Sequence, residues 1–181
     1  MRKGIFAVLA IVLLIGTFLQ PLPVLANGAT QKLIGAASDS TFTGVASGGY
    51  FALAQFTAEA SGGLTEIKVR CASSGSIKLA IYSDNSGEPG ELLSNAFTDS
   101  TPVIAGWNTI PFPTTPITAG QKYWLARNSD GNILYYQTQP GAHFRYKAAA
   151  SSGFSFPSSA GGGFGSDQVY HLMAGWGTPA P

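Results

Sequence analysis

The stretch Ile67-Lys68-Val69-Arg70-Cys71 alternates apolar and charged side chains, and Ile77-Lys78-Leu79-Ala80-Ile81-Tyr82 repeats a similar pattern shortly afterwards. A period of two is typical of a β-strand with one buried face and one face in water. The residues between them, Ala72-Ser73-Ser74-Gly75-Ser76, are turn formers, so the two strands can pair as a hairpin. These two segments predict a protein built from strands.

The same alternation, or a high content of aromatic residues, predicts further strands on both sides of this pair. They are expected at Tyr50–Thr57, Trp107–Phe112, Lys122–Arg127, Asn132–Gln137, Phe144–Lys147 and Gln168–Ala174. Clusters of Gly, Pro, Asn and Asp separate the strands at short intervals, and no segment has a sustained helical period with caps. This pattern predicts an all-β protein, with an antiparallel β-sandwich or barrel.

The N-terminus has the features of a secretory signal peptide. Arg2 and Lys3 give it a positive charge, and residues 5–18 are almost wholly apolar. Prolines break this run before Ala26, where cleavage is expected because small residues precede the break. The alternative is an uncleaved membrane anchor, for which the run is short, since a span needs about 20 apolar residues. We therefore expect residues 1–26 to be removed and the mature chain to be secreted or held at the cell surface, with no transmembrane span.

Charge composition narrows the classes of partner. After loss of the signal peptide, eight basic and nine acidic residues remain, so the formal charge is about −1. Such a chain lacks the basic surface expected for binding nucleic acid or anionic lipid. The one cysteine, Cys71, shares a strand face with Ile67 and Val69, so we expect it to be buried and unpaired.

The mature chain divides into three kinds of sequence. Residues 27–49 are small and polar, and form either a flexible leader or a first strand. Residues 50–181 are expected to form the β-sandwich domain, interrupted by a loop at 148–166 that is rich in Gly, Ser and Ala. Three phenylalanines are spaced along this loop, at Phe154, Phe156 and Phe164. We expect them to attach the loop to the sandwich, because large apolar side chains are usually buried when a core lies within reach.

Several motifs lie between Leu64 and Tyr136, in the order Ala80–Asp84, Gly87–Leu93, Gly106–Thr109 and Ile117–Ala126. In order and spacing they resemble a recurring extracellular β-sandwich module of bacterial secreted and surface proteins. The resemblance implies a jelly-roll-like sandwich outside the cell, similar in outline to non-catalytic carbohydrate-binding modules. It transfers no ligand-binding residue to this chain.

Signatures of catalysis are weak. The two histidines, His143 and His171, have no recognisable triad partners, and no Gly-x-Ser-x-Gly elbow is present. We expect His171 to be a hydrogen-bonded or exposed strand residue. One cysteine and two distant histidines do not match the usual zinc ligand sets. A glycan-acting hydrolase would need paired carboxylates, and several acids lie in or beside one turn. We expect no enzyme activity.

The same turn offers hard oxygen ligands from Asp84, Asn85 and Glu88. Calcium prefers such ligands, although their spacing does not match an EF-hand. Calcium is therefore a weak candidate, and no other cofactor is expected.

Aromatic side chains are the main candidates for ligand binding: Tyr135, Tyr136, Tyr146, Trp107 and Trp176. Sugars stack on exposed aromatic rings while polar neighbours fix their orientation. The alternative for each ring is burial in the core. The favoured hypothesis is a non-catalytic module that binds a glycan or surface polymer, for example in adhesion. A second is a self-assembling structural subunit whose segment 27–49 adds a strand to a neighbouring sheet. A hydrolase is the third.

Overall fold

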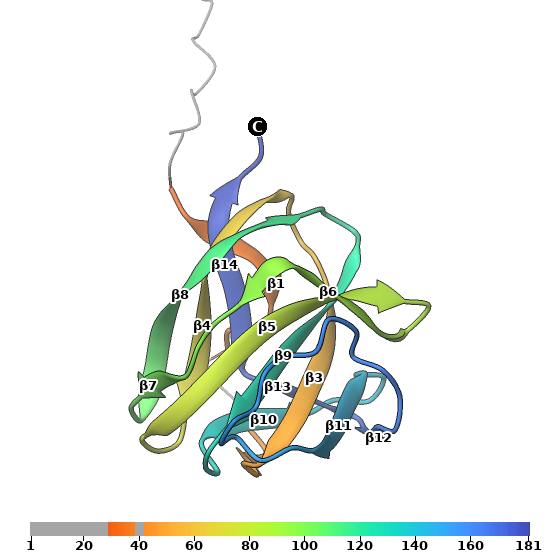
Figure 1. Ribbon diagram of the computed structural model, residues 1–181. Coiled ribbons are helices and arrows are strands. Elements are labelled where there is room, and N and C mark those ends of the chain that lie inside the picture. The colour runs from red at the N-terminus through yellow and green to blue at the C-terminus, as the bar shows by residue number, and fades with distance from the viewer. Residues whose placement is uncertain (1–28, 39–41) are drawn as a thin grey trace, which may run out of the picture.

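The computed structural model describes residues 29–38 and 42–181, which form two antiparallel β-sheets packed as a sandwich (Figure 1). The prediction of an all-β antiparallel sandwich is confirmed, while its jelly-roll-like arrangement stays a prediction. The expected signal peptide, residues 1–26, lies outside the described residues. Within the described residues, no helix has the length and apolar character needed to cross a membrane.

One sheet, here called sheet A, has the strand order β1-β14-β4-β10-β13, with β8 paired to β4 and β2 paired to β10. Its strands are β1 (Gln31–Gly35), β2 (Gly44–Ala46), β4 (Gly62–Cys71), β8 (Gly106–Ile117), β10 (Leu134–Thr138), β13 (Val169–His171) and β14 (Met173–Pro179).

The other sheet, sheet B, has the order β12-β11-β3-β9-β5-β6, with β7 paired to β5. Its strands are β3 (Tyr50–Thr57), β5 (Gly75–Asn85), β6 (Glu88–Phe97), β7 (Thr101–Val103), β9 (Lys122–Ser129), β11 (Phe144–Ala148) and β12 (Gly165–Asp167).

The hairpin predicted from residues 67–82 is wrong. Strand β4 pairs with β14 and β8 in sheet A, whereas β5 pairs with β9 and β6 in sheet B. The chain therefore crosses from one sheet to the other between Cys71 and Gly75. This crossing lets Ile67 and Val69 face Ile77 and Leu79 across the space between the sheets, where all four are fully buried. Burial of apolar surface favours this arrangement, and the turn formers at 72–76 suit it as well as a hairpin.

Cys71 belongs to this core between the sheets. The side chain is 1% exposed and unpaired, as predicted. Burial raises the pKa of its thiol to about 11, so the reactive thiolate is scarce at neutral pH.

The segment before the sandwich domain supplies two strands. Strand β1 pairs with β14 of its own chain and buries Leu33 and Ile34 completely, and β2 pairs with β10. Addition of this segment to a neighbouring molecule would require β1 to leave β14.

Residues 149–164, here called the covering loop and blue in Figure 1, lie over the outer face of sheet B. Phe154, Phe156 and Phe164 pack around Phe51, with ring centres 5.5–5.8 Å from its own. The prediction that these phenylalanines attach the loop to the sandwich is confirmed. Sheet B is thus covered on both faces, which explains why Trp124 is fully buried.

Candidate functional site

A cleft opens between the two sheets at the edge where β3, β9 and β11 face β10 and β13. These strands lie in the lower part of Figure 1. Its volume is about 270 Å³, just below the roughly 300–1,000 Å³ of typical small-ligand pockets. Strand β3 lines this space with Tyr50 and Ala52, and Ala54 follows on the same face, whereas β5 turns isoleucine and leucine side chains into the core. Because protein interiors are otherwise closely packed, the small alanine side chains leave room for the cleft.

Two rows of side chains form its walls. In sheet B, Tyr146, Ala52 and Arg127 lie side by side in register on β11, β3 and β9. In sheet A, Tyr136 on β10 pairs with His171 on β13. All five residues line the cleft. Arg127 and His171 are 2% and 1% exposed, whereas Tyr146 is 36% exposed, so the basic groups lie deep and the tyrosine lies near the opening.

Tyr136 and Tyr146 each lie over a glycine of a short edge strand. A Cβ atom on Gly44 would come within 2.8 Å of the Tyr136 hydroxyl, and one on Gly165 within 2.9 Å of Cζ of Tyr146. Both glycines are the register partners of these tyrosines. The absence of a side chain allows each ring to lie close to the neighbouring backbone, as in other strand pairs of glycine and an aromatic residue.

Arg127 is a buried cation. Its Nε donates to Nδ1 of His171 at 3.4 Å, Nη1 donates to Oγ of Ser129 at 2.9 Å, and Nη2 donates to the carbonyl oxygen of Ser47 at 3.0 Å. Burial lowers the pKa of the guanidinium to about 10, which still leaves it charged at neutral pH. Among residues 29–38 and 42–181, the structure has no ion pair between Arg127 and a carboxylate.

His171 is held neutral by its surroundings. Burial and, to a smaller extent, the charge of Arg127 place the pKa of this imidazole well below its usual value. Since Nδ1 accepts a hydrogen bond from Arg127, the single ring proton is assigned to Nε2. Of the two expected states of His171, hydrogen-bonded or exposed, the structure shows the hydrogen-bonded one. With a neutral imidazole beside it, Arg127 supplies the positive charge of the cleft.

The five aromatic candidates from the sequence fall into two sets. Tyr136 and Tyr146 line the cleft. Tyr135, Trp107 and Trp176 belong to the outer face of sheet A, because neighbouring residues on a strand point to opposite sides of the sheet.

On this outer face, cations lie close to the aromatic rings. The Lys68 ammonium is 4.1 Å from the ring centre of Trp176. The Arg70 guanidinium is 5.8 Å from the ring of Trp107 and 5.9 Å from that of Tyr135. These cation–π contacts take up ring surface on which a sugar would otherwise stack.

Among the aromatic and basic residues that line the cleft, four were not binding candidates from the sequence: Tyr50, Phe144, Arg127 and His171. One signal was present for Arg127, which shares a strand face with the core residue Leu125. A charged side chain on a buried face is rare without a partner or a function. The residues opposite Arg127 could not be identified in the same way, because they depend on how the two sheets pack.

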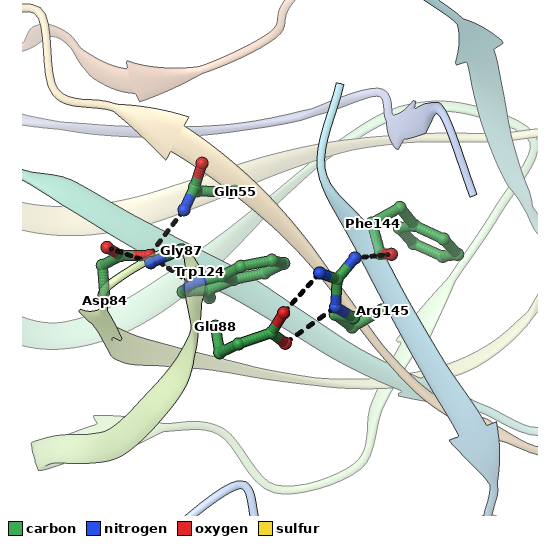
Figure 2. A network of polar contacts seen from close by, with 7 residues as sticks. All are labelled: Gln55, Asp84, Gly87, Glu88, Trp124, Phe144 and Arg145. Carbon is green, nitrogen blue, oxygen red and sulfur yellow. Dashed lines mark hydrogen bonds and ion pairs between the residues drawn. The ribbon is translucent and has the colours of Figure 1, made fainter. Parts of the chain in front are cut away.

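In the turn proposed for calcium, the carboxylates of Asp84 and Glu88 already interact with other groups of the protein (Figure 2). The carboxylate of Asp84 accepts hydrogen bonds from the side chain of Gln55, from Nε1 of Trp124 at 2.8 Å and from the backbone N–H of Gly87 at 3.0 Å. Burial alone would raise the pKa of Asp84, but these hydrogen bonds outweigh it and hold the pKa below its usual value. Asp84 thus anchors the buried indole of Trp124.

Glu88 accepts two hydrogen bonds from Arg145, one of them from Nε at 2.8 Å (Figure 2). Asn85 is the register partner of Glu88 in the β5–β6 hairpin. Nowhere in the described residues do three or more His, Cys, Asp or Glu side chains form a group that could hold a metal ion. Calcium binding by Asp84, Asn85 and Glu88 stays a prediction without added support.

No protein-family model matches the chain, and no curated protein is significantly similar to it.

Proposed function

We propose that the protein is a non-catalytic binding module, secreted or held at the cell surface, whose cleft takes a sugar residue of a glycan or surface polymer. The observation that supports this best is the meeting of Tyr136 and Tyr146 in one cleft above Arg127. Aromatic surface and a few fixed polar groups are the combination that small-ligand sites use for affinity and orientation. The resemblance of residues 64–136 to extracellular, jelly-roll-like modules supports the same function and location.

The cleft suits this role better than the outer face of sheet A, where Lys68 and Arg70 contact the aromatic rings. It also fits binding better than hydrolysis. Asp167 is the one acid among the described residues that line the cleft, whereas most glycoside hydrolases use two carboxyl groups. The structural-subunit hypothesis has less support, because β1 is already paired with β14 of its own chain.

A glycan array probed with the mature protein tests the proposal, followed by titration of the best ligand against single variants. Tyr146→Ala and Tyr136→Ala are each expected to lose about 1–3 kcal/mol of binding, the contribution of aromatic stacking in other systems. Tyr135→Ala is the matched control, since it removes the neighbouring ring on the opposite face of β10. It is expected to bind like the wild type.

Melting temperatures distinguish loss of binding from loss of folding. If the cleft variants bind normally while Tyr135→Ala or Trp107→Ala loses affinity, the ligand lies on the outer face of sheet A and the cleft assignment is wrong. If no glycan binds the folded protein, the proposal fails as a whole.

A further inference from the structure

The positive charge of Arg127 lies inside the cleft without a negative partner from the described residues. Transfer of a guanidinium out of water costs several kcal/mol unless charge and hydrogen bonds compensate it. Here the three acceptors are a neutral imidazole nitrogen, a hydroxyl and a backbone carbonyl. They satisfy hydrogen bonds but bring no full negative charge.

Arg127 also has unused donors. A guanidinium has five N–H groups, and three of them have partners in the described residues. Each terminal nitrogen therefore keeps one N–H group without a partner in the described residues. A carboxylate that pairs with a guanidinium in the bidentate manner accepts from two N–H groups. Both Arg127 and Ser47, which accepts from Nη2, line the cleft.

We infer that the cleft binds an acidic ligand whose carboxylate pairs with Arg127 while its ring lies between Tyr136 and Tyr146. This inference rests on the proposed function and narrows its ligand to sugars that carry a carboxylate, such as hexuronic acids. The ligand carboxylate supplies the charge and the two acceptors that the described surroundings of Arg127 lack.

The acid nearest the opening does not take this role. Asp167 is exposed, and its Oδ1 accepts the backbone N–H of Gln168 at 2.7 Å. It forms no ion pair with Arg127 in the described part of the chain. At the rim, its carboxylate can accept hydrogen bonds from ligand hydroxyls. We expect Asp167→Asn to bind an acidic sugar at least as tightly as the wild type does, because one repulsive charge is removed.

The test compares acidic disaccharides with their neutral forms. Digalacturonate and diglucuronate are titrated by calorimetry against the mature protein, in parallel with their methyl esters, which keep the ring and remove the charge. At least one acid is expected to bind about tenfold or more tightly than its ester, because hydrogen bonds to charged groups are worth that much.

Arg127→Met is the decisive variant. It keeps a long side chain and removes the charge, but it leaves the three acceptors of Arg127 without their donor, so a lower melting temperature is expected. Titrated below its melting temperature, this variant is expected to lose the preference for the acid over the ester. Lys32→Met, which removes a charge from the distant strand β1, is expected to keep that preference.

The outcomes separate the two proposals. If acid and ester bind equally well, or if Arg127→Met keeps the preference for the acid, the inference is wrong and the carbohydrate proposal stands. If neither form binds, the inference is wrong, and the glycan array decides the carbohydrate proposal separately. If acetate or succinate competes as well as the uronates, Arg127 is a carboxylate receptor, but the ligand is not a sugar.

Discussion

Sheet B is covered on its two faces by different means. Towards sheet A it buries aliphatic side chains, among them Ile77, Leu79 and Ile81. Towards the covering loop it buries aromatic rings and presents side-chain donors: Lys78 to the carbonyl of Phe154, and Tyr82 at 2.7 Å to that of Pro157.

The difference follows from backbone hydrogen bonding. The strands of sheet A satisfy each other's backbone N–H and C=O groups. The face of sheet B that packs against them therefore needs to offer only apolar surface. The covering loop has few such partners, and its buried carbonyl groups require donors from elsewhere. Lys147 provides another, at 2.8 Å from the carbonyl oxygen of Ala160. A layer between a sheet and a loop therefore depends on polar side chains that a layer between two sheets can omit.

Leu79→Ala tests the aliphatic layer. The side chain is fully buried between the sheets. Its truncation should lower the free energy of unfolding by about 2–5 kcal/mol, because it leaves a cavity as well as losing buried apolar surface. Urea denaturation measures the change. A loss below about 1 kcal/mol would mean that this layer repacks freely.

Asp84→Asn tests the polar support of the loop-side layer. The hydrogen bonds that Asp84 accepts are charge-assisted, so we expect a loss of about 1–2 kcal/mol at neutral pH, reduced by partial exposure. Because the pKa of Asp84 is lowered in the folded protein, its contribution is fully present above the unfolded pKa of about 3.9. That contribution is lost as the pH falls through the folded pKa. Wild type and variant should therefore converge below pH 4 in denaturation curves, and a constant difference down to pH 2 would contradict this account.

Tyr82→Phe removes one donor to the covering loop and leaves the ring in place. The hydroxyl hydrogen bond to Pro157 is worth about 0.5–1.5 kcal/mol. The effect should be local, so chymotrypsin should cut after Phe154 or Phe164 faster than in the wild type. Leu79→Ala is the comparison, since it should accelerate cleavage through global unfolding at many sites. Unchanged cleavage in Tyr82→Phe would show that the phenylalanines alone hold the loop.

Glu88→Gln weakens an ion pair at the border of the layer between sheet B and the covering loop. The Arg145 guanidinium lies 5.8 Å from the ring centre of Trp124, and the Glu88 side chain is 57% exposed. Exposed ion pairs contribute less than about 1 kcal/mol to stability, so the melting temperature should change little. The change should be smaller still at high salt, which screens the ion pair. A larger loss would mean that this pair positions the indole.

The strand pattern of the sequence was enough to predict the sandwich, because alternation reports directly which side chains are buried. It was not enough to place β4 and β5 in different sheets, since the same turn formers serve a hairpin and a crossing. The cleft itself was not predicted. Tyr136 and Tyr146 were candidates as aromatic residues, but only the facing of the two sheets brings them to Arg127.

The glycines under Tyr136 and Tyr146 have a consequence for variation of this protein. A methyl group at Gly44 or Gly165 would meet the outer part of a tyrosine side chain, which can tilt, and not the body of a sheet. Both glycines belong to three-residue strands at the margin of the fold. Single replacements there would tilt the walls of the cleft while leaving the aliphatic interior intact. Under the proposed function, such replacements would change ligand selectivity in small steps without destabilising the scaffold.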